Sequence, residues 1–410
     1  MARRWFVLTM RVVYCTDTYL PQVNGVSVVT DISVRGLMAR GWEVEVIAPR
    51  YPRQTIGARP DVFGVPRTAV VHSIRSVPAP RYPELRMALP DAWTVYRTIQ
   101  RAAPDLVHCA TEFMIGRLGL WAANRLGIPV VTSYHTNFRQ YAEVYGLGGL
   151  GGMLERYLAR FHRAAWRTYT PSESSRAELL RLGVEEVEVW GRGVDLAQFR
   201  PDQRSAQLRI TLGVRQAFTF LYVGRLAPEK NVAVVIRAFA KLLERVRPDA
   251  IRLVIAGSGP DEAALRESAP PGTVFLGNLD RTRDLPALYA TADAFVFAST
   301  TETLGLVVLE AMASGLPVLA TPAGGVAEFL RDGVNGLAFA ANDADGLAHR
   351  MHQLVAGSHL SEALGAGALA TARALGWDAE VERLDRSYRA ICANAQQVRE
   401  LPLRLNLKKL

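Results

Sequence analysis

The chain has 410 residues, 49% of them hydrophobic and 21% charged, and it carries a net charge of +9. Its length allows two or three globular domains, and its composition excludes an intrinsically disordered protein. The positive charge is compatible with an anionic partner, but 44 of the 48 basic residues are arginines scattered along the sequence. A general arginine bias explains this charge equally well, and no interleaved basic and aromatic patch indicates nucleic acid as a partner.

The three cysteines, Cys15, Cys109 and Cys392, lie far apart and in no C-x-x-C arrangement. They predict neither a disulfide framework nor a zinc site, and a reducing cytoplasm is the expected location. No segment reaches the roughly 18 uninterrupted apolar residues that a membrane-spanning helix needs. We therefore expect a cytoplasmic protein, and a peripheral position on the inner face of the cytoplasmic membrane stays open.

The N-terminal segment MARRWFVLTMRVVYCTD imitates a signal peptide through its pair of arginines. Arg11 interrupts the apolar run, however, and no small-residue cleavage site follows before the charged end of the strand. We interpret this segment as mature chain, with Met10 as an alternative start.

The first half of the chain repeats a strand-helix-strand order. MRVVYCTD (10–17) is a short β-branched strand, and DISVRGLMARGWEVEVIAPR (31–50) reads as a helix, a stop at Gly41 and a second strand. PDLVHCATE (104–112), a helix over 116–127 and IPVVTSYHT (128–136) repeat this order. Such nearly continuous apolar strands are typical of parallel sheets that are covered on both faces.

The same order restarts after Pro201. A predicted strand begins each of the segments FTFLYVGRL, IRLVIAGSG, TVFLGNL, ADAFVFAST and LPVLATPAG, and a helix that begins near Asn231 lies between the first two. The polar stretch 200–213 is interpreted as the linker, and the tail from Trp377 is predicted to be an amphipathic helix. The expected architecture is α/β, with domains over 1–200 and 214–376 and a helical segment over 377–410.

Ligands of open α/β sheets bind beyond the carboxyl ends of the strands, so polar residues and glycines there are the candidates. Gly25 precedes a helix after the first strand, where it allows an anion to approach backbone N–H groups; a tight turn that needs glycine explains it equally well. The surrounding loop does not match the G-x-G-x-x-G dinucleotide fingerprint. In the second half, Arg225 and Lys230 in GRLAPEKN suit the two phosphates of a diphosphate, the alternative being a solvated loop with a pair to Glu229.

The stretch TETLGLVVLE places a glutamate at each end of an apolar run, Glu302 and Glu310. In one continuous helix the two would lie some 80° apart, since eight steps of about 100° separate them. We therefore place Glu302 in a loop, Gly305 and Leu306 at the helix start and Glu310 inside the helix, partly buried. Buried carboxylates need hydrogen-bond donors, which sugar and ribose hydroxyls provide, and the positive helix end suits a phosphate.

GRLAPEKN, the E-x7-E spacing and the following EAMASGLPVLATPAGGVAEFLRDGVNGLAF together resemble the retaining glycosyltransferases of family four. These enzymes have the GT-B fold of two facing Rossmann-like domains. The stretches TDTYLPQVNGVS, PDLVHCATE, SYHTNF and WGRGVD are similar to the branch of GDP-mannose-dependent α-mannosyltransferases and sulfoquinovosyl-lipid synthases. The resemblance implies an acceptor-side domain over 1–200, a nucleotide-sugar domain over 214–376 and a last helix that returns to the first domain.

The resemblance also implies roles for the residues around the transferred sugar. Arg225 and Lys230 would hold the donor diphosphate, and Glu302 would accept hydrogen bonds from sugar hydroxyls. His135, at the strand end in SYHT, would lie beside the sugar from the other domain. These four residues are the expected catalytic group.

Further donor contacts follow from the same resemblance. Glu310 would bind the ribose hydroxyls, and Gly25 would let its loop approach the diphosphate and the acceptor. Backbone groups of the turn from Gly277 to Leu279 would contact the base, and those of Gly305 and Leu306 would contact the phosphate. No metal ion is expected, because no D-x-D site is evident in the right place and the resemblance implies a metal-independent enzyme. No cofactor is expected, and the donor substrate would be GDP-mannose or a UDP-hexose.

The resemblance implies transfer of a hexose, with mannose favoured, from the nucleotide sugar to a hydroxyl of a lipid or glycan acceptor with retention of configuration. Two alternatives stay open: a sugar-nucleotide epimerase of the same fold, and a non-catalytic basic module that binds membranes. For the acceptor, a stripe of four arginines over 154–167, beside apolar residues, is compatible with an interfacial helix and a peripheral membrane contact. A core-packed helix with a solvated arginine face explains the stripe equally well.

Overall fold

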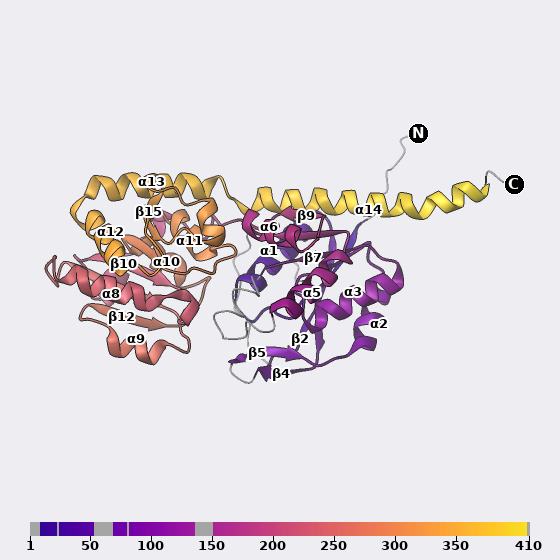
Figure 1. Ribbon diagram of the computed structural model, residues 1–410, viewed down its shortest axis with the longest axis horizontal. Helices are drawn as coiled ribbons and strands as arrows, with labels where there is room; N and C mark the ends of the chain where they lie inside the picture. Colours follow the sequence, from indigo (N-terminus) through magenta and orange to yellow (C-terminus); the bar gives the residue numbers. More distant parts are fainter. Residues whose placement is uncertain (1–8, 23, 53–68, 80–81, 136–150, 408–410) are drawn as a thin grey trace.

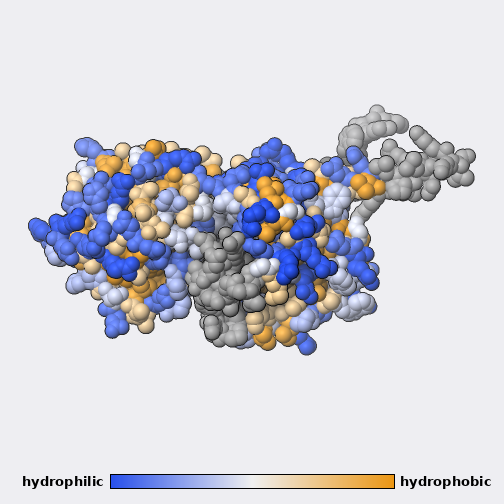
Figure 2. All heavy atoms as spheres, viewed as in Figure 1, coloured by the Kyte–Doolittle hydropathy of each residue, from blue (hydrophilic) through white to orange (hydrophobic). Residues whose placement is uncertain are grey.

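The computed structural model describes residues 9–22, 24–52, 69–79, 82–135 and 151–407. The chain forms two α/β domains that lie end to end, and one long helix runs along the first of them (Figure 1). Hydrophilic residues prevail on the face seen in Figure 2, with smaller hydrophobic patches among them. Among the described residues, no helix is long and apolar enough to cross a bilayer.

The first domain is built on a seven-stranded sheet in which every pairing is parallel. In spatial order its strands are β3 (Val70–Ile74), β2 (Glu43–Pro49), β1 (Arg11–Cys15), β6 (Leu106–Cys109), β7 (Val130–Ser133), β8 (Arg167–Thr170) and β9 (Val187–Val189). Its helices are α1 (Gly25–Ala39), α2 (Ala92–Ala102), α3 (Met114–Leu126), α5 (Gly151–Arg163) and α6 (Glu173–Arg181), and β4 (Ser76–Ala79) pairs with β5 (Tyr82–Ala88) as a hairpin. The central strands are buried along nearly their whole length, which explains their continuous apolar sequences.

The second domain repeats this architecture with a six-stranded parallel sheet. In spatial order its strands are β12 (Thr273–Gly277), β11 (Ile251–Ala256), β10 (Phe218–Val223), β13 (Ala294–Phe297), β14 (Val318–Ala320) and β15 (Gly336–Ala338). Its α-helices are α7 (Ala206–Thr211), α8 (Val232–Leu243), α9 (Glu262–Ser268), α10 (Leu285–Thr291), α11 (Leu306–Ala313), α12 (Ala344–Ala356) and α13 (Ser358–Arg373). Short 3-10 turns η2 (Pro201–Gln203), η3 (Pro228–Lys230) and η4 (Gly324–Glu328) complete it.

The last helix, α14 (Trp377–Leu407), crosses back from the second domain to the first and runs along α1. Val381, Leu384 and Tyr388 on this helix are fully buried in the core of the first domain. The Tyr388 hydroxyl is hydrogen-bonded to the hydroxyl of Tyr14, at 2.9 Å, and to the ring of His108. Two Rossmann-like domains with a returning C-terminal helix confirm the predicted fold class.

The chain crosses between the domains at two places that lie side by side. The amide of Val194 donates a hydrogen bond of 2.9 Å to the carbonyl of Leu375, and Val194 pairs with Gly376 in an isolated parallel bridge. Gly193 is packed directly on the ring of Trp377, which a Cβ at position 193 would approach to 2.4 Å. The two crossings are thus joined by backbone and side-chain contacts.

The stretch 200–213, predicted as the linker, is instead an ordered part of the second domain. It forms η2 and α7, which pack against α10. Arg204 and Arg209 both form ion pairs with Asp293, at 2.6 and 3.0 Å. Proline and charge in this stretch reflect a surface helix with specific partners, and the crossing itself lies a few residues earlier.

The predicted stripe over 154–167 is only partly a helical face. Helix α5 ends at Arg163, and Arg167 lies on β8, where it pairs with Glu188 at 3.0 Å. The apolar side of α5 is covered by the domain, since Leu158 and Phe161 are buried. The interpretation as a core-packed helix with an exposed arginine face therefore fits α5.

Candidate active site

The carboxyl edges of the two sheets face each other. His135 follows β7 in the first domain, Thr303 follows β13 in the second, and the Thr303 hydroxyl donates a hydrogen bond of 2.8 Å to the His135 carbonyl. Nearby, Arg192 forms an ion pair of 2.6 Å with Glu328 across the same interface. Loops that follow strands of both domains thus meet, which is where a ligand of two such sheets is expected.

Lys230 and Glu302 lie together in the second domain at this edge. Lys230 ends η3, after β10, and its ammonium contacts Glu302 Oε1. The Ser299 hydroxyl donates a second hydrogen bond of 3.0 Å to the same oxygen. Both charged side chains are mostly buried, at 15% and 14% exposed. The structure therefore brings together two predicted catalytic residues that are 72 positions apart in the sequence.

Arg225 lies in the same loop and forms an ion pair with Glu229, whose side chain is fully buried. Burial, the largest single influence, raises the pKa of Glu229, but the hydrogen bonds it accepts and the charges of Arg225 and Lys230 together lower the pKa below its usual value. The Tyr222 hydroxyl donates a hydrogen bond of 3.0 Å to the Arg225 carbonyl. The predicted alternative, an intraloop pair, is thus present. A guanidinium offers five N–H donors, so this pair is compatible with an anionic ligand as well.

Glu302 lies in a loop and Glu310 inside helix α11, as the sequence predicts. Gly305 takes a left-handed conformation (φ 75°) at the start of the helix, and Leu306 is the first helical residue. A Cβ at position 305 would lie 2.7 Å from Val326. Glycine is required here by both conformation and space, and no side chain of the described chain caps this helix start.

The buried carboxylate of Glu310, for which the sequence suggested sugar and ribose hydroxyls as donors, already has donors within the protein. Arg281 donates to Oε1 at 2.6 and 2.9 Å, and the Tyr289 hydroxyl donates to Oε2 at 3.1 Å. The Glu310 side chain is 2% exposed. The protein itself therefore supplies donors to both oxygens, and a ribose would have to share them.

Gly25 begins helix α1, whose N-cap is Asn24. Asn24 and Ser27 form a reciprocal capping box, with 2.9 Å from the Asn24 side chain to the Ser27 amide. Gly25 is exposed, lies outside the left-handed region, and has no atom within 4 Å of the place of a Cβ. The interpretation as a tight turn that needs glycine is therefore wrong. Nothing in the described fold requires glycine at this position.

The turn predicted to contact the base lies at the end of β12. Gly277 has a left-handed conformation (φ 68°), and its carbonyl accepts a hydrogen bond of 2.7 Å from the Gly257 amide. Leu279 is partly buried against the core of the second domain. Arg281 follows two residues later and reaches Glu310. The turn and Glu310 thus belong to one local arrangement at the carboxyl edge of β11 and β12.

His135 is half-buried as a residue, and burial of its imidazole together with nearby His162 lowers its pKa to about 4. The imidazole is therefore neutral at neutral pH and available as a hydrogen-bonding group rather than as a cation. His162 itself pairs with Glu112, with 3.6 Å between Nε2 and Oε1, and both side chains are buried. Burial raises the pKa of Glu112. The sequence analysis did not select this pair; Glu112 ends the PDLVHCATE segment. Residues 136–150, which include the end of the SYHTNF stretch, lie outside the described residues.

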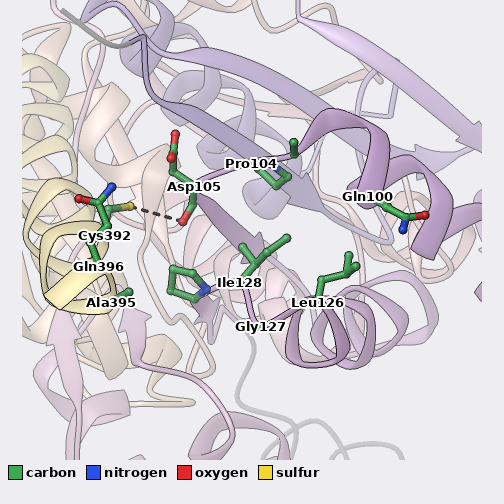
Figure 3. A pocket seen from close by; sticks show the side chains of 11 residues that line it. Gln100, Pro104, Asp105, Leu126, Gly127, Ile128, Cys392, Ala395 and Gln396 are labelled. Atoms are coloured by element: carbon green, nitrogen blue, oxygen red, sulfur yellow. Dashed lines mark hydrogen bonds between the residues drawn. The ribbon is translucent and has the colours of Figure 1, made fainter. Parts of the chain in front are cut away.

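A cavity of about 470 Å³ lies at the opposite edge of the first sheet (Figure 3). Asp105 and Pro129, at the amino ends of β6 and β7, line it together with Cys392 and Gln396 from α14. The Cys392 thiol donates to the Asp105 carbonyl at 3.6 Å. Because ligands of parallel sheets bind at the carboxyl edge, this cavity is distinct from the candidate site.

The sequence matches two family descriptions. Residues 23–198 match Glycosyltransferase Family 4, and residues 207–370 match Glycosyl transferases group 1. The GDP-mannose-dependent alpha-mannosyltransferase of Mycobacterium tuberculosis is 35% identical over 349 residues, which are 84% of this chain and 89% of that protein. A sulfoquinovosyl transferase of Arabidopsis thaliana is 31% identical, over 86% of this chain and 68% of that protein.

Among solved structures, Anabaena HepE in complex with UDP-glucose has a TM-score of 0.73 at 20% identity, covering 94% of this chain and 100% of that one. Sucrose-phosphate synthase from Thermosynechococcus elongatus has the same score, identity and coverage. At 20% identity, the similarity to these two structures shows the fold alone. The sequence relatives exclude the non-catalytic module and disfavour the epimerase, because they are named as transferases. The chain belongs to the family-four glycosyltransferases and is an enzyme with the GT-B fold.

Proposed function

We propose that the protein transfers a hexose, with mannose favoured, from a nucleoside-diphosphate sugar to a hydroxyl of a lipid or glycan acceptor with retention of configuration. The observation that carries the proposal is the Lys230–Glu302 pair at the carboxyl edge of the second sheet, opposite His135. This pair supports a role for Lys230 as the cation beside a leaving diphosphate and for Glu302 as the acceptor for sugar hydroxyls. The mannose preference is supported by relatives at 34 to 36% identity that are named as GDP-mannose-dependent.

In this proposal Arg225 and Lys230 stabilise the negative charge that grows on the diphosphate as the glycosidic bond breaks. Such charge stabilisation by fixed donors is usually the largest single contribution to catalysis. The backbone at Gly305 and Leu306 adds the positive end of helix α11. Glu302 holds the sugar hydroxyls, Glu310 the ribose, and the turn from Gly277 to Leu279 the base.

The acceptor hydroxyl attacks from the face that the diphosphate leaves, and its proton passes to a leaving phosphate oxygen. This route needs no carboxylate nucleophile, which a retaining hydrolase uses. Neutral His135 lies on the acceptor side, where it can hydrogen-bond a sugar hydroxyl without placing a cation beside an electron-poor anomeric carbon. Gly25 leaves open space for the diphosphate and acceptor at the start of α1. The proposal includes no metal and no cofactor besides the donor.

The direct test incubates the purified protein with GDP-mannose, GDP-glucose, UDP-glucose and UDP-galactose, with and without a membrane lipid extract. We expect release of nucleoside diphosphate to be fastest with GDP-mannose and to rise when the extract is added. The anomeric configuration of the new glycoside, read by NMR, is expected to equal that of the donor. An inverted product, or conversion of the free donor to its epimer, would overturn the proposal.

A further inference from the structure

Helix α3 presents an exposed ladder in which aromatic and arginine side chains alternate. Arg117, Trp121 and Arg125 follow one another at intervals of four residues along one side of α3, Phe113 stands at its N-cap four residues before Arg117, and all four are exposed. Phe113 is 57% exposed and Trp121 43% exposed. Large aromatic residues are rarely left in water side by side on a monomeric protein, and such surfaces mark interaction sites.

Helix α2 packs beside α3 and continues the pattern. Trp93, Arg97 and Arg101 follow at the same interval, and Trp93 is 62% exposed. The Arg97 guanidinium lies 4.6 Å from the centre of the Trp93 ring, and Tyr96 bridges Trp93 to Trp121 through ring contacts of 6.1 and 5.8 Å. Trp93, Tyr96 and Trp121 therefore form one connected cluster across the two helices, with arginines at its margin.

Helix α5 extends this surface on the other side of α3. The hydroxyl of Tyr157 contacts the Glu112 carbonyl just before α3, and Phe161 packs in the same core cluster as α3. Its exposed arginines are Arg156, Arg160 and Arg163. The three helices contain seven arginines, and their one carboxylate, Glu155, pairs with Arg181 at 3.2 Å.

We infer that the outer face of α2, α3 and α5, called here the tryptophan–arginine face, docks on an anionic lipid bilayer. Tryptophan favours the interface between headgroups and acyl chains, and each arginine near an anionic surface adds electrostatic attraction. A protein partner is less well matched. The seven arginines repel one another because no free carboxylate lies among them on these helices, and only a strongly acidic protein would offset this repulsion. In Figure 1, α2 and α3 lie on the side of the first domain away from the second, so a bilayer there leaves the domain interface accessible.

The position of Phe113 connects this face to the candidate site. Phe113 caps the start of α3, where Asp17 accepts hydrogen bonds from the Ile115 amide at 2.9 Å and from the Thr111 hydroxyl at 2.7 Å. Asp17 and Thr111 follow β1 and β6, so the ladder begins at the same sheet edge as His135. This inference rests on the proposed function insofar as a lipid acceptor would reach the site from the docked bilayer.

Co-sedimentation tests the face directly. The full chain is mixed with vesicles of phosphatidylcholine alone and of phosphatidylcholine with 40% phosphatidylglycerol, at about 0.1 and 0.5 M NaCl. We expect binding to the anionic vesicles that weakens at high salt. Trp93→Ala with Trp121→Ala, and separately Arg97→Glu with Arg117→Glu, are each expected to weaken it by about tenfold or more. The matched controls on the second domain, Ile210→Ala (50% exposed) and Arg247→Glu, are expected to bind like wild type.

Further measurements separate this inference from the proposed function. GDP binding by calorimetry and donor hydrolysis without lipid are expected to be unchanged in the face variants, and unchanged hydrolysis, which in the proposal involves both domains, also reports that the first domain folds. Equal vesicle binding by the face variants and the controls would overturn the inference that this face docks on a bilayer, and it would leave the proposed enzymatic function unaffected. If light scattering shows a dimer for the wild type and monomers for the face variants, the face binds a second copy of the chain, and the inference of bilayer docking is overturned. Vesicle binding without any GDP binding would instead contradict the proposed function alone.

Discussion

The hydroxyl of Thr303 in the second domain donates a hydrogen bond of 2.8 Å to the backbone carbonyl of His135 in the first. This bond joins the loop that carries Glu302 to the strand end that carries the proposed acceptor-side histidine. Because the residues of the proposed site come from both domains, the position of one loop relative to the other determines whether this site is complete.

Donor binding is expected to draw the two domains together by rotation at the paired crossings, Gly191–Asp195 and Leu375–Trp377. Few residues there need to move, whereas 200–213 is fixed to α10. Small-angle scattering with saturating GDP should show a smaller radius of gyration. Arg192→Gln, which breaks the 2.6 Å pair with Glu328, should enlarge the radius of the ligand-free protein. If the ligand-free protein has an open cleft and its radius of gyration does not change with saturating GDP, the domains do not close, and the site is already formed without the donor.

Lys230→Ala is expected to lower turnover, because the leaving diphosphate loses a charge-assisted contact. The loss of transition-state stabilisation is expected to be about 2 to 4 kcal/mol. The same substitution leaves Glu302 without its ion-pair partner, so a modest fall in melting temperature is expected too. Steady-state kinetics and thermal unfolding measure the two effects. Lys241→Ala is the matched control, since Lys241 pairs with exposed Asp345 on the surface. Wild-type turnover in a folded Lys230→Ala enzyme would refute the assignment to the diphosphate.

Glu310→Gln is expected to weaken GDP binding about tenfold and to destabilise the protein by about 1 to 3 kcal/mol, because Arg281 loses a buried carboxylate. Calorimetry and urea unfolding measure the two quantities. Adding Arg281→Gln should recover part of the stability and none of the affinity. Unchanged affinity of the single variant would mean that Glu310 only holds Arg281.

Gly25→Ala is expected to leave the melting temperature unchanged or slightly higher, because a Cβ there meets no atom within 4 Å and alanine favours a helix. The Michaelis constant for the donor should nevertheless rise by about tenfold if a phosphate approaches this backbone. Gly305→Ala is the contrasting variant, which should lose stability because of its left-handed backbone and close contact with Val326. Normal donor kinetics of Gly25→Ala would exclude the close approach.

Acid is expected to destabilise the protein through His108, whose pKa burial and nearby His135 lower to about 3. Between that value and the ordinary pKa of 6.5, the unfolded chain binds a proton that the folded chain does not, so stability falls as pH falls through this window. The contribution amounts to about 2 kcal/mol at pH 5 relative to pH 7. His108→Gln should flatten this part of the profile measured by urea unfolding, whereas exposed His349→Gln should not. Parallel profiles for wild type and His108→Gln would contradict this origin.

The sequence predicted the features that depend on local order along the chain. Alternating strands and helices are visible as apolar runs that end in polar residues, and the angular argument placed Glu302 in a loop and Glu310 in a helix. The family resemblance then selected the strand-end loops that the structure brings together at the domain interface.

Other features depend on contacts between distant residues, which no local pattern contains. Arg281 binds Glu310 from a loop 29 positions away, and Arg204 and Arg209 fix an apparent linker to Asp293. Polar composition alone could not distinguish a solvated linker from a surface helix with ion-pair partners. A hydrophobic stripe on α5 likewise did not reveal which elements cover it.

The returning helix α14 separates the order of synthesis from the order of folding. The second domain is one continuous segment, so it has all its strands once about residue 373 has left the ribosome. The first domain is not complete at that point, because its core includes Val381, Leu384 and Tyr388 from α14. Burying each such side chain contributes about 1.5 to 3 kcal/mol. The half that is synthesised first must therefore wait, partly open, for the last helix, and a chain that stops before Trp377 would expose the Tyr14–His108 side of its core to chaperones and proteases.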